Sequence, residues 1–167
     1  MLYTDTYHAP IGLLTLASDG EKLTGIWFDG QKYFGSGLSK ETEKKALPVF
    51  EQTVDWLDLY FSGQKPYFTP PLLLSGSDFR MAVWNRLLQI PYGETVTYGQ
   101  IAKELSVEMG FAHMSAQAVG GAVGHNPISI IVPCHRVLGT GGKLTGYAGG
   151  IKKKMALLEL EGIPYCL

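Results

Sequence analysis

Two adjacent residues, Cys134 and His135, are the side chains in this sequence best suited to nucleophilic chemistry. A thiol attacks as its thiolate, and with an ordinary pKa of about 8.5 it needs a nearby base or positive charge at neutral pH. Adjacent residues do not normally face each other in regular structure. We therefore expect His135 to act through a water molecule or an irregular turn, and to need a third group that orients it.

The alternative for this pair is structural. A buried cysteine is often an inert small hydrophobe, and an arbitrary Cys-His pair is more often inert than catalytic. Cys166, next to the C-terminal end and without a basic neighbour, keeps the inert interpretation. Two lone cysteines and four scattered histidines lack the spacing of a zinc site. We expect no metal and no cofactor.

Cys134 lies where a predicted buried strand should give way to a turn. Residues 128–132 form a continuous apolar run, and Pro133 then restricts the backbone just before the cysteine. Beyond it, residues 139–142 predict a hairpin turn with 144–147 returning. A final helix should end at Gly162 and bury Ile151, Met155 and Leu158.

Upstream, three helices should support this strand. An apolar stripe of Phe79, Val83, Leu87 and Ile90, with Trp84 beside it, predicts the first. Thr97 and Gln100 form a capping box that opens the second, in which Ile101, Ala102 and Leu105 should be buried. Small residues over 115–123 predict the third, so the last two suggest a helix-turn-helix. Small side chains there serve either close packing or close approach of a ligand such as DNA.

The first third of the chain is predicted to be β. Strand-like runs cover residues 3–7, 13–17 and 23–28, and a helix with Phe50, Val54, Leu57 and Phe61 on one face follows. The Pro- and Gly-containing segment 62–77 predicts a linker. We expect an α+β protein with an N-terminal domain over 1–75, a small antiparallel sheet with a helix, and a mostly helical C-terminal domain over 76–167.

Composition adds weaker constraints. The sequence lacks a run of about 18 apolar residues and an evident signal peptide, so we expect a cytosolic protein. Residues 1–75 carry six Lys/Arg and nine Asp/Glu, a charge of −3, while 76–167 carry eight and six, a charge of +2. The asymmetry is compatible with a nucleic-acid-facing C-terminal part that makes few phosphate contacts.

The stretch Ile131-Val132-Pro133-Cys134-His135-Arg136-Val137, preceded by Gly124-His125-Asn126-Pro127-Ile128, resembles the active-site signature of the methylated-DNA–protein-cysteine methyltransferases, also called O6-alkylguanine-DNA alkyltransferases. Further stretches resemble this family in the same order. They lie at 79–93, 98–102, 118–122 and 146–150, and Pro10-Ile11-Gly12 resembles the start of its N-terminal domain. The similarity therefore spans most of the chain.

The resemblance implies a role for each matching residue. Cys134 would accept the alkyl group, His135 would activate it through water, and Glu161 would orient His135. Asn126 would brace the active-site turn, and Tyr98, next to Gly99, would help to rotate the nucleotide and donate toward the guanine. Tyr147 and Ala148 belong to the loop that would close over the alkylated base.

The resemblance also implies a fold and a partner. The N-terminal domain would be ribonuclease H-like and the C-terminal domain a winged helix-turn-helix that binds double-stranded DNA through the minor groove, without sequence preference. The activity would be a single, irreversible transfer from O6-alkylguanine, with O4-alkylthymine as a further possible substrate, after the nucleotide is flipped out. We expect a monomer, no cofactor, no metal and no membrane association.

One position departs from the family. The residue before Ala118-Val119-Gly120 is often arginine, which fills the gap left by the flipped nucleotide, whereas here it is Gln117. Glutamine occupies space and donates hydrogen bonds but carries no charge, so we predict that Gln117→Arg tightens DNA binding.

Three alternative functions fit the sequence less well. A non-catalytic alkyltransferase-like protein would lack the cysteine, which is present. A winged-helix regulator would need major-groove side chains, which the Gly/Ala face of 115–123 does not offer. A Cys-His hydrolase would need an oxyanion hole, for which the sequence gives no indication.

Overall fold

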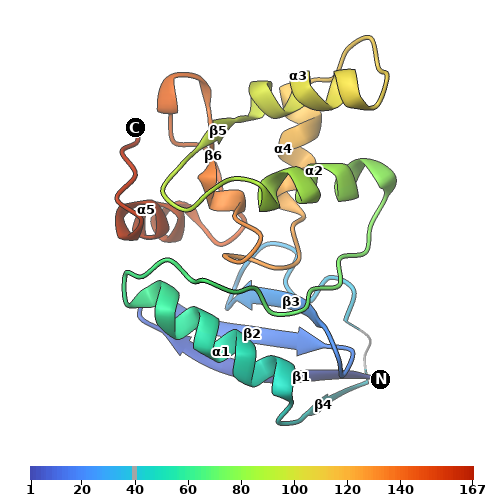
Figure 1. The fold of residues 1–167 in the computed structure, drawn as a ribbon, viewed down its shortest axis with the longest axis vertical. Coiled ribbons are helices and arrows are strands. Elements are labelled where there is room, and N and C mark those ends of the chain that lie inside the picture. The colour runs from blue at the N-terminus through green and yellow to red at the C-terminus, as the bar shows by residue number, and fades with distance from the viewer. Residues whose placement is uncertain (39–40) are drawn as a thin grey trace. The chain divides into compact units, whose positions relative to one another are not determined.

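The computed structural model describes residues 1–38 and 41–167, which form two compact units (Figure 1). Unit 1 contains residues 1–74 together with 127–129, and unit 2 contains 75–126 and 130–167. Unit 1 holds a sheet and one helix, whereas unit 2 is mostly helical, so the architecture is α+β as predicted.

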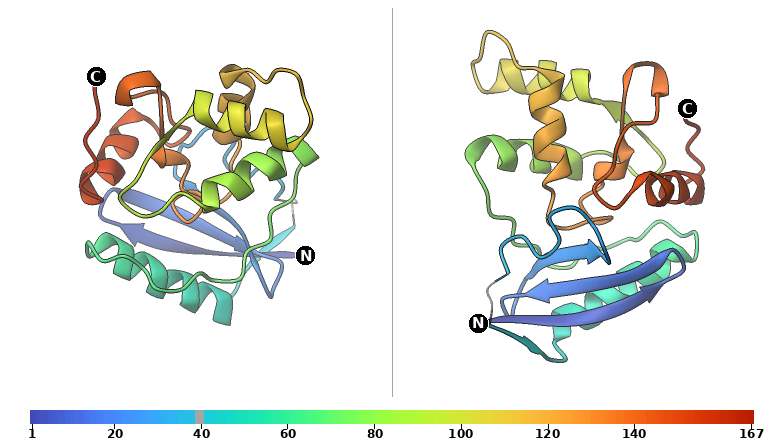
Figure 2. Two further views of the ribbon diagram at one scale, coloured as in Figure 1. Left: turned by 45° about the horizontal axis from the view of Figure 1, so that its top comes forward. Right: turned by 180° about the vertical axis from the view of Figure 1, so that it is seen from behind.

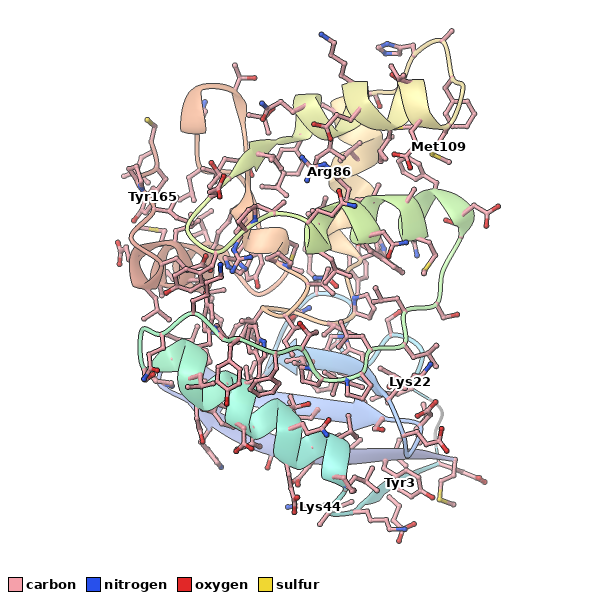
Figure 3. The ribbon with its side chains drawn as sticks, viewed as in Figure 1. Tyr3, Lys22, Lys44, Arg86, Met109 and Tyr165 are labelled. Atoms are coloured by element: carbon pink, nitrogen blue, oxygen red, sulfur yellow. The ribbon has the colours of Figure 1, made fainter. Side chains whose placement is uncertain are left out.

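The sheet of unit 1 has the strand order β3-β2-β1-β4. β1 (Leu2–Ala9), β2 (Gly12–Ser18) and β3 (Leu23–Phe28) are antiparallel neighbours that coincide with the three predicted runs. β4 (Thr42–Lys44) was not predicted, and it pairs parallel to β1 at the edge of the sheet. The sheet is therefore mixed rather than purely antiparallel. Tyr3 and Lys44 mark this edge in Figure 3.

Helix α1 (Pro48–Phe61) packs along one face of the sheet, as the right-hand view of Figure 2 shows. Pro48 at its first position has no amide hydrogen to leave unpaired, and Gly63, with φ 86°, follows its end. The buried face includes Phe50 and Leu57 as predicted, but Trp56 and Tyr60 replace Val54 and Phe61 as its other large members.

In unit 2, a serine or threonine caps each of the first three helices. α2 (Asp78–Leu88), α3 (Tyr98–Glu108) and α4 (Ala116–Gly124) begin after Ser77, Thr97 and Ser115, whose hydroxyls accept from the helix amides. The capping box of α3 is present, and its predicted inner face is buried. α4 packs on both α2 and α3. Arg86 on α2, labelled in Figure 3, pairs with Glu104 on α3 at 2.5 Å.

The segment around Cys134 is irregular. A short parallel pair joins β5 (Val96–Thr97) to β6 (Val137–Leu138), and two 3-10 turns, η1 (Cys134–Arg136) and η2 (Thr140–Gly142), flank β6. The predicted strand over 128–132 is wrong. Ile128 makes an isolated bridge to Ile26, and Ile130 has a φ of 71°, which no strand accommodates. The apolar run is buried, but it turns instead of extending.

The last helix also differs from its prediction. α5 (Ile151–Leu160) ends before Gly162 (φ 72°), as expected, and it buries Leu158. Ile151 is exposed, and Lys154 occupies the buried face instead. The segment 144–147 forms no return strand, although Gly139 N donates to Lys143 O (2.8 Å) and closes the turn. None of the described helices is long and apolar enough to cross a membrane.

Candidate active site

Cys134 is the first residue of η1 and is 5% exposed. Its backbone amide donates to Val132 O at 2.8 Å, and the Asn126 side-chain amide donates to the same carbonyl at 2.8 Å. Two donors therefore converge on one acceptor just before Pro133. This arrangement fixes the turn that carries the thiol, and it brings Asn126 to the cysteine.

The surroundings of the sulfur act on its ionisation in opposite directions. Burial raises the pKa of the Cys134 thiol, and this is the larger effect. The Asn126 amide, the Lys154 ammonium and the Tyr147 hydroxyl beside it lower the pKa. Because burial prevails, Cys134 rests as a neutral thiol and needs a base to become a nucleophile.

A buried carboxylate, that of Glu161 at the end of α5, joins both residues that follow Cys134. Its Oε2 lies 2.5 Å from His135 Nε2, and its Oε1 accepts from Arg136 Nε at 2.8 Å. The amide of Gly93 also donates to Oε1, at 3.0 Å. Arg136 in addition donates to Ile90 O at 2.8 Å. The carboxylate is thus held by three groups.

This network determines the charge of each member. Burial alone would raise the pKa of Glu161, but its hydrogen bonds to His135 and Arg136, together with the charge of Arg136, outweigh burial and lower the pKa to about 2. Burial lowers the pKa of His135 against the opposing effect of Glu161, so the imidazole is neutral at neutral pH. An ionised carboxylate only accepts, so Nε2 carries the proton and Nδ1 has the lone pair.

Tyr98, the first residue of α3, is half-buried, and burial raises its pKa. Its hydroxyl lies 3.0 Å from Thr145 Oγ1, and Lys154 Nζ donates to the same oxygen at 3.0 Å. Tyr98, Thr145 and Lys154 therefore form one hydrogen-bonded chain. Neither Thr145 nor Lys154 was identified from the sequence.

The other predicted residues divide into two groups. Asn126, His135, Glu161 and Tyr147 all act on the cysteine or on its direct neighbours. The remaining three make no such contact in the described part of the chain: Gly99 and Gln117 are exposed and Ala148 is half-buried. Arg136 was part of the motif but had no predicted role, and only its place beside His135 could have indicated one.

In the part of the chain that the structure describes, no group of three or more His, Cys, Asp or Glu side chains could hold a metal ion. Cys166 is exposed, and its thiol contacts Gly141 O at 3.7 Å.

Comparisons with known proteins show which family shares this sequence. The descriptions "6-O-methylguanine DNA methyltransferase, ribonuclease-like domain" and "DNA binding domain" match residues 2–74 and 78–163. A methylated-DNA–protein-cysteine methyltransferase of Mycobacterium tuberculosis is 49% identical over 96% of this chain and 93% of its own length. A Haemophilus influenzae protein of the same name is 42% identical, with 98% and 88% covered.

A crystal structure of Mycobacterium tuberculosis OGT in complex with DNA shares 48% identity with this chain. It covers 95% of this chain and 92% of its own, with a TM-score of 0.82. The chain belongs to the family of methylated-DNA–protein-cysteine methyltransferases.

Proposed function

We propose that this chain repairs DNA by transferring the alkyl group of O6-alkylguanine to the sulfur of Cys134, once per molecule. The observation that carries the proposal is the placement of a buried thiol on a fixed turn, followed directly by a histidine held by Glu161. Membership of the family supports the same reaction.

His135 is the base in this proposal. Its Nε2 is bound to Glu161 at 2.5 Å, so it exchanges a proton with the thiol through Nδ1 and a bridging water. Glu161 fixes the tautomer and stabilises the imidazolium that forms. Arg136 keeps Glu161 ionised, since it donates to the second carboxylate oxygen.

The chemistry needs no cofactor. A sulfur–carbon bond forms while the bond from that carbon to O6 breaks, and the electron pair leaves with the guanine. The thiol proton passes to water and His135. The thioether has no leaving group that would restore the thiol, so each molecule acts once. Asn126 braces the turn, while Tyr147 and Ala148 close over the base.

DNA is the proposed partner, and α4 is the proposed contact surface. A Cβ on Gly121 or Gly124 would meet no atom within 4 Å, so packing inside the protein does not require glycine there. The small residues would instead let a DNA backbone approach α4 closely. In this proposal the contact is made in the minor groove and without sequence preference. The nearly balanced charge of the chain agrees with few phosphate contacts.

Flipping of the nucleotide follows from the burial of the sulfur. Cys134 is only 5% exposed, so its sulfur cannot reach a base that stays stacked in a duplex, and the nucleotide must enter the protein. Tyr98 and Gly99 lie at the start of α3, and Gln117 lies exposed on α4. In this proposal Tyr98 helps to rotate the nucleotide, and Gln117 fills the gap that the nucleotide leaves in the duplex.

The test is the intact mass of the protein after incubation with a duplex that contains O6-methylguanine. We expect a gain of one methyl group in the wild type and in Cys166→Ser, and none in Cys134→Ala. Binding to the duplex without a change in mass would support a non-catalytic recognition protein instead. A second duplex with O4-methylthymine examines the breadth of the substrate range.

A further inference from the structure

The turn between α2 and β5 contacts the Glu161 network at three points. Ile90 O accepts from Arg136 Nη1 at 2.8 Å, and the Gly93 amide donates to Glu161 Oε1 at 3.0 Å. Between these two residues in the chain, Tyr92 places its ring under the Arg136 guanidinium, whose central carbon lies 5.7 Å from the ring centroid. The proposed reaction assigns no role to this turn.

The backbone of the turn fixes its conformation. The Glu94 amide donates to Pro91 O at 3.1 Å, and Gly93 has a φ of 81°, as the third residue of a type II turn requires. Glycine adopts this conformation without strain. The turn therefore presents the Tyr92 ring and the Gly93 amide to the network in a defined place.

The contacts distinguish the two oxygens of the Glu161 carboxylate. A carboxylate without such contacts can rotate and exchange its oxygens. Here the Gly93 amide and Arg136 Nε both donate to Oε1, at 3.0 and 2.8 Å. Oε2 is the oxygen that faces His135 Nε2. The orientation of the carboxylate toward the base therefore depends on the donors that hold its other oxygen.

Tyr92 acts on this arrangement through Arg136. A guanidinium can donate hydrogen bonds at its edge while an aromatic ring attracts it from one face. Arg136 does both, since its Nε and Nη1 donate to Glu161 and Ile90 while its central carbon lies over the half-buried Tyr92 ring. The ring thus restricts movements of the guanidinium that the hydrogen bonds alone would permit.

We propose that Tyr92 is a positioning residue for the alkyl transfer, which holds Arg136 against Glu161 and so keeps the second carboxylate oxygen aimed at His135. This inference rests on the proposed function, in which His135 takes the proton of the thiol. The role requires the aromatic ring of Tyr92 and not its hydroxyl.

The role has a measurable signature, because a base is needed only while the thiol is protonated. Cys134 rests as a neutral thiol, so its reaction at neutral pH depends on His135. At alkaline pH the thiol loses its proton to hydroxide without that help. Lys154 and Tyr147, which also face the sulfur, are unchanged in a Tyr92 variant and cancel in the ratio of variant to wild-type rates. A positioning defect therefore disappears from this ratio as the pH rises.

The main variant is Tyr92→Leu, which removes the aromatic face but keeps an apolar side chain. In a Cys166→Ser background, methyl transfer from an O6-methylguanine duplex and alkylation of Cys134 by iodoacetamide should both slow about fivefold at neutral pH. For iodoacetamide, the ratio to the wild-type rate should return to one near about pH 10. Tyr92→Phe keeps the ring and should react at the wild-type rate throughout.

Two controls separate this role from a general loss of packing. Tyr165→Leu changes another half-buried tyrosine of unit 2, whose hydroxyl donates to Glu159 at 2.8 Å, and it should leave both rates unchanged. In an Arg136→Gln background, Tyr92→Leu should cause no further slowing, because the ring then has no cation to hold.

A wild-type rate for Tyr92→Leu at neutral pH would overturn this inference while leaving the proposed function intact. A defect that persists undiminished to about pH 10 would also overturn it, since Tyr92 would then act on the shape of the pocket. Further slowing in the Arg136→Gln background would show that the ring does not act through Arg136. If the wild-type chain gains no methyl group, the proposed function fails and the inference fails with it.

Discussion

The two units bury different kinds of polar side chain. In the described part of unit 1 these are neutral, namely Ser18, Gln31, Thr53 and Ser129. In unit 2 they are Asn126, His135, Arg136, Lys154 and Glu161, four of which can carry a charge. Unit 1 is thus built for packing, whereas unit 2 accepts the desolvation of charged groups around a single thiol.

This contrast has an energetic meaning. A buried ion pair is often no more stabilising than apolar residues of the same volume, but removal of one partner leaves a buried charge uncompensated. In unit 2, the Glu161 carboxylate serves His135, Arg136 and the Gly93 amide together. The members of such a network depend on one another for their charge and geometry, so a substitution should have different consequences in the two units.

The largest expected effect is on the transfer rate of Glu161→Gln. Glutamine cannot fix the His135 tautomer or stabilise an imidazolium, so the single-turnover rate should fall on the order of a thousandfold, or about 4 kcal/mol in the barrier. The matched control is Glu159→Gln, since Glu159 is exposed on the same helix and should not affect the rate. A wild-type transfer rate in Glu161→Gln would contradict the view that the buried charged groups of unit 2 serve the reaction.

In unit 1, Leu57→Ala should affect stability alone. Leu57 is fully buried on α1, and its truncation should lower the free energy of unfolding by about 3.5 kcal/mol in urea titrations. The transfer rate of the folded fraction should stay at the wild-type value. A slower rate in fully folded protein would show that unit 1 contributes to the chemistry.

The pH dependence of stability should distinguish the units further. The pKa of Glu161 is lower in the folded protein, about 2, than its ordinary value of 4.5. Its contribution is therefore fully present above pH 4.5 and is lost as the pH falls toward 2, with a total on the order of 3 kcal/mol. Glu161→Gln should flatten this part of the curve. Leu57→Ala should lower the whole curve without changing its slope.

A smaller effect is expected for Gly121→Ala on α4. Alanine is the better helix former by about 1 kcal/mol, and its Cβ meets no protein atom, so the melting temperature should rise. The same methyl group should weaken binding to duplex DNA severalfold, as measured by fluorescence anisotropy. Unchanged affinity would place the DNA elsewhere.

The smallest effect is that of Gln117→Arg. An exposed arginine on α4 should tighten duplex binding a fewfold at low salt, and the salt slope should steepen by roughly one phosphate contact. If affinity does not change at any salt concentration, Gln117 does not lie at the DNA.

The capping box of α3 was predictable, because Thr97 and Gln100 act through contacts local in sequence. Cys134 and His135 could be singled out by their chemistry, whereas their catalytic roles and Glu161 came from a resemblance, and the structure adds the distance between His135 and Glu161. The strand over 128–132 could not be distinguished from a buried turn, because an apolar run records burial and not dihedral angles. Ile130, with its φ of 71°, shows the difference.

Lys154 illustrates the other limit. Lysine is almost never fully buried, so a run of three lysines at 152–154 predicts a solvent-facing surface. The structure buries the third of them, one helical turn before Leu157 and Leu158. Helical spacing alone would place Lys154 on the same face as Leu157 and Leu158. The oxygens that accept its hydrogen bonds lie on β6 and after η2, and only the tertiary structure brings them to the lysine. The contacts of Thr145 with Lys154 and Tyr98 are likewise set by tertiary structure, so the sequence did not indicate them.

The burial of Cys134 also determines how long the protein keeps its capacity to react. Oxidants attack thiolates that solvent can reach, whereas this sulfur is covered and rests protonated. A molecule that reacts once cannot replace a sulfur lost to peroxide. Shielding therefore preserves the reagent until a damaged base brings the chemistry to it, and the exposed Cys166 should oxidise first.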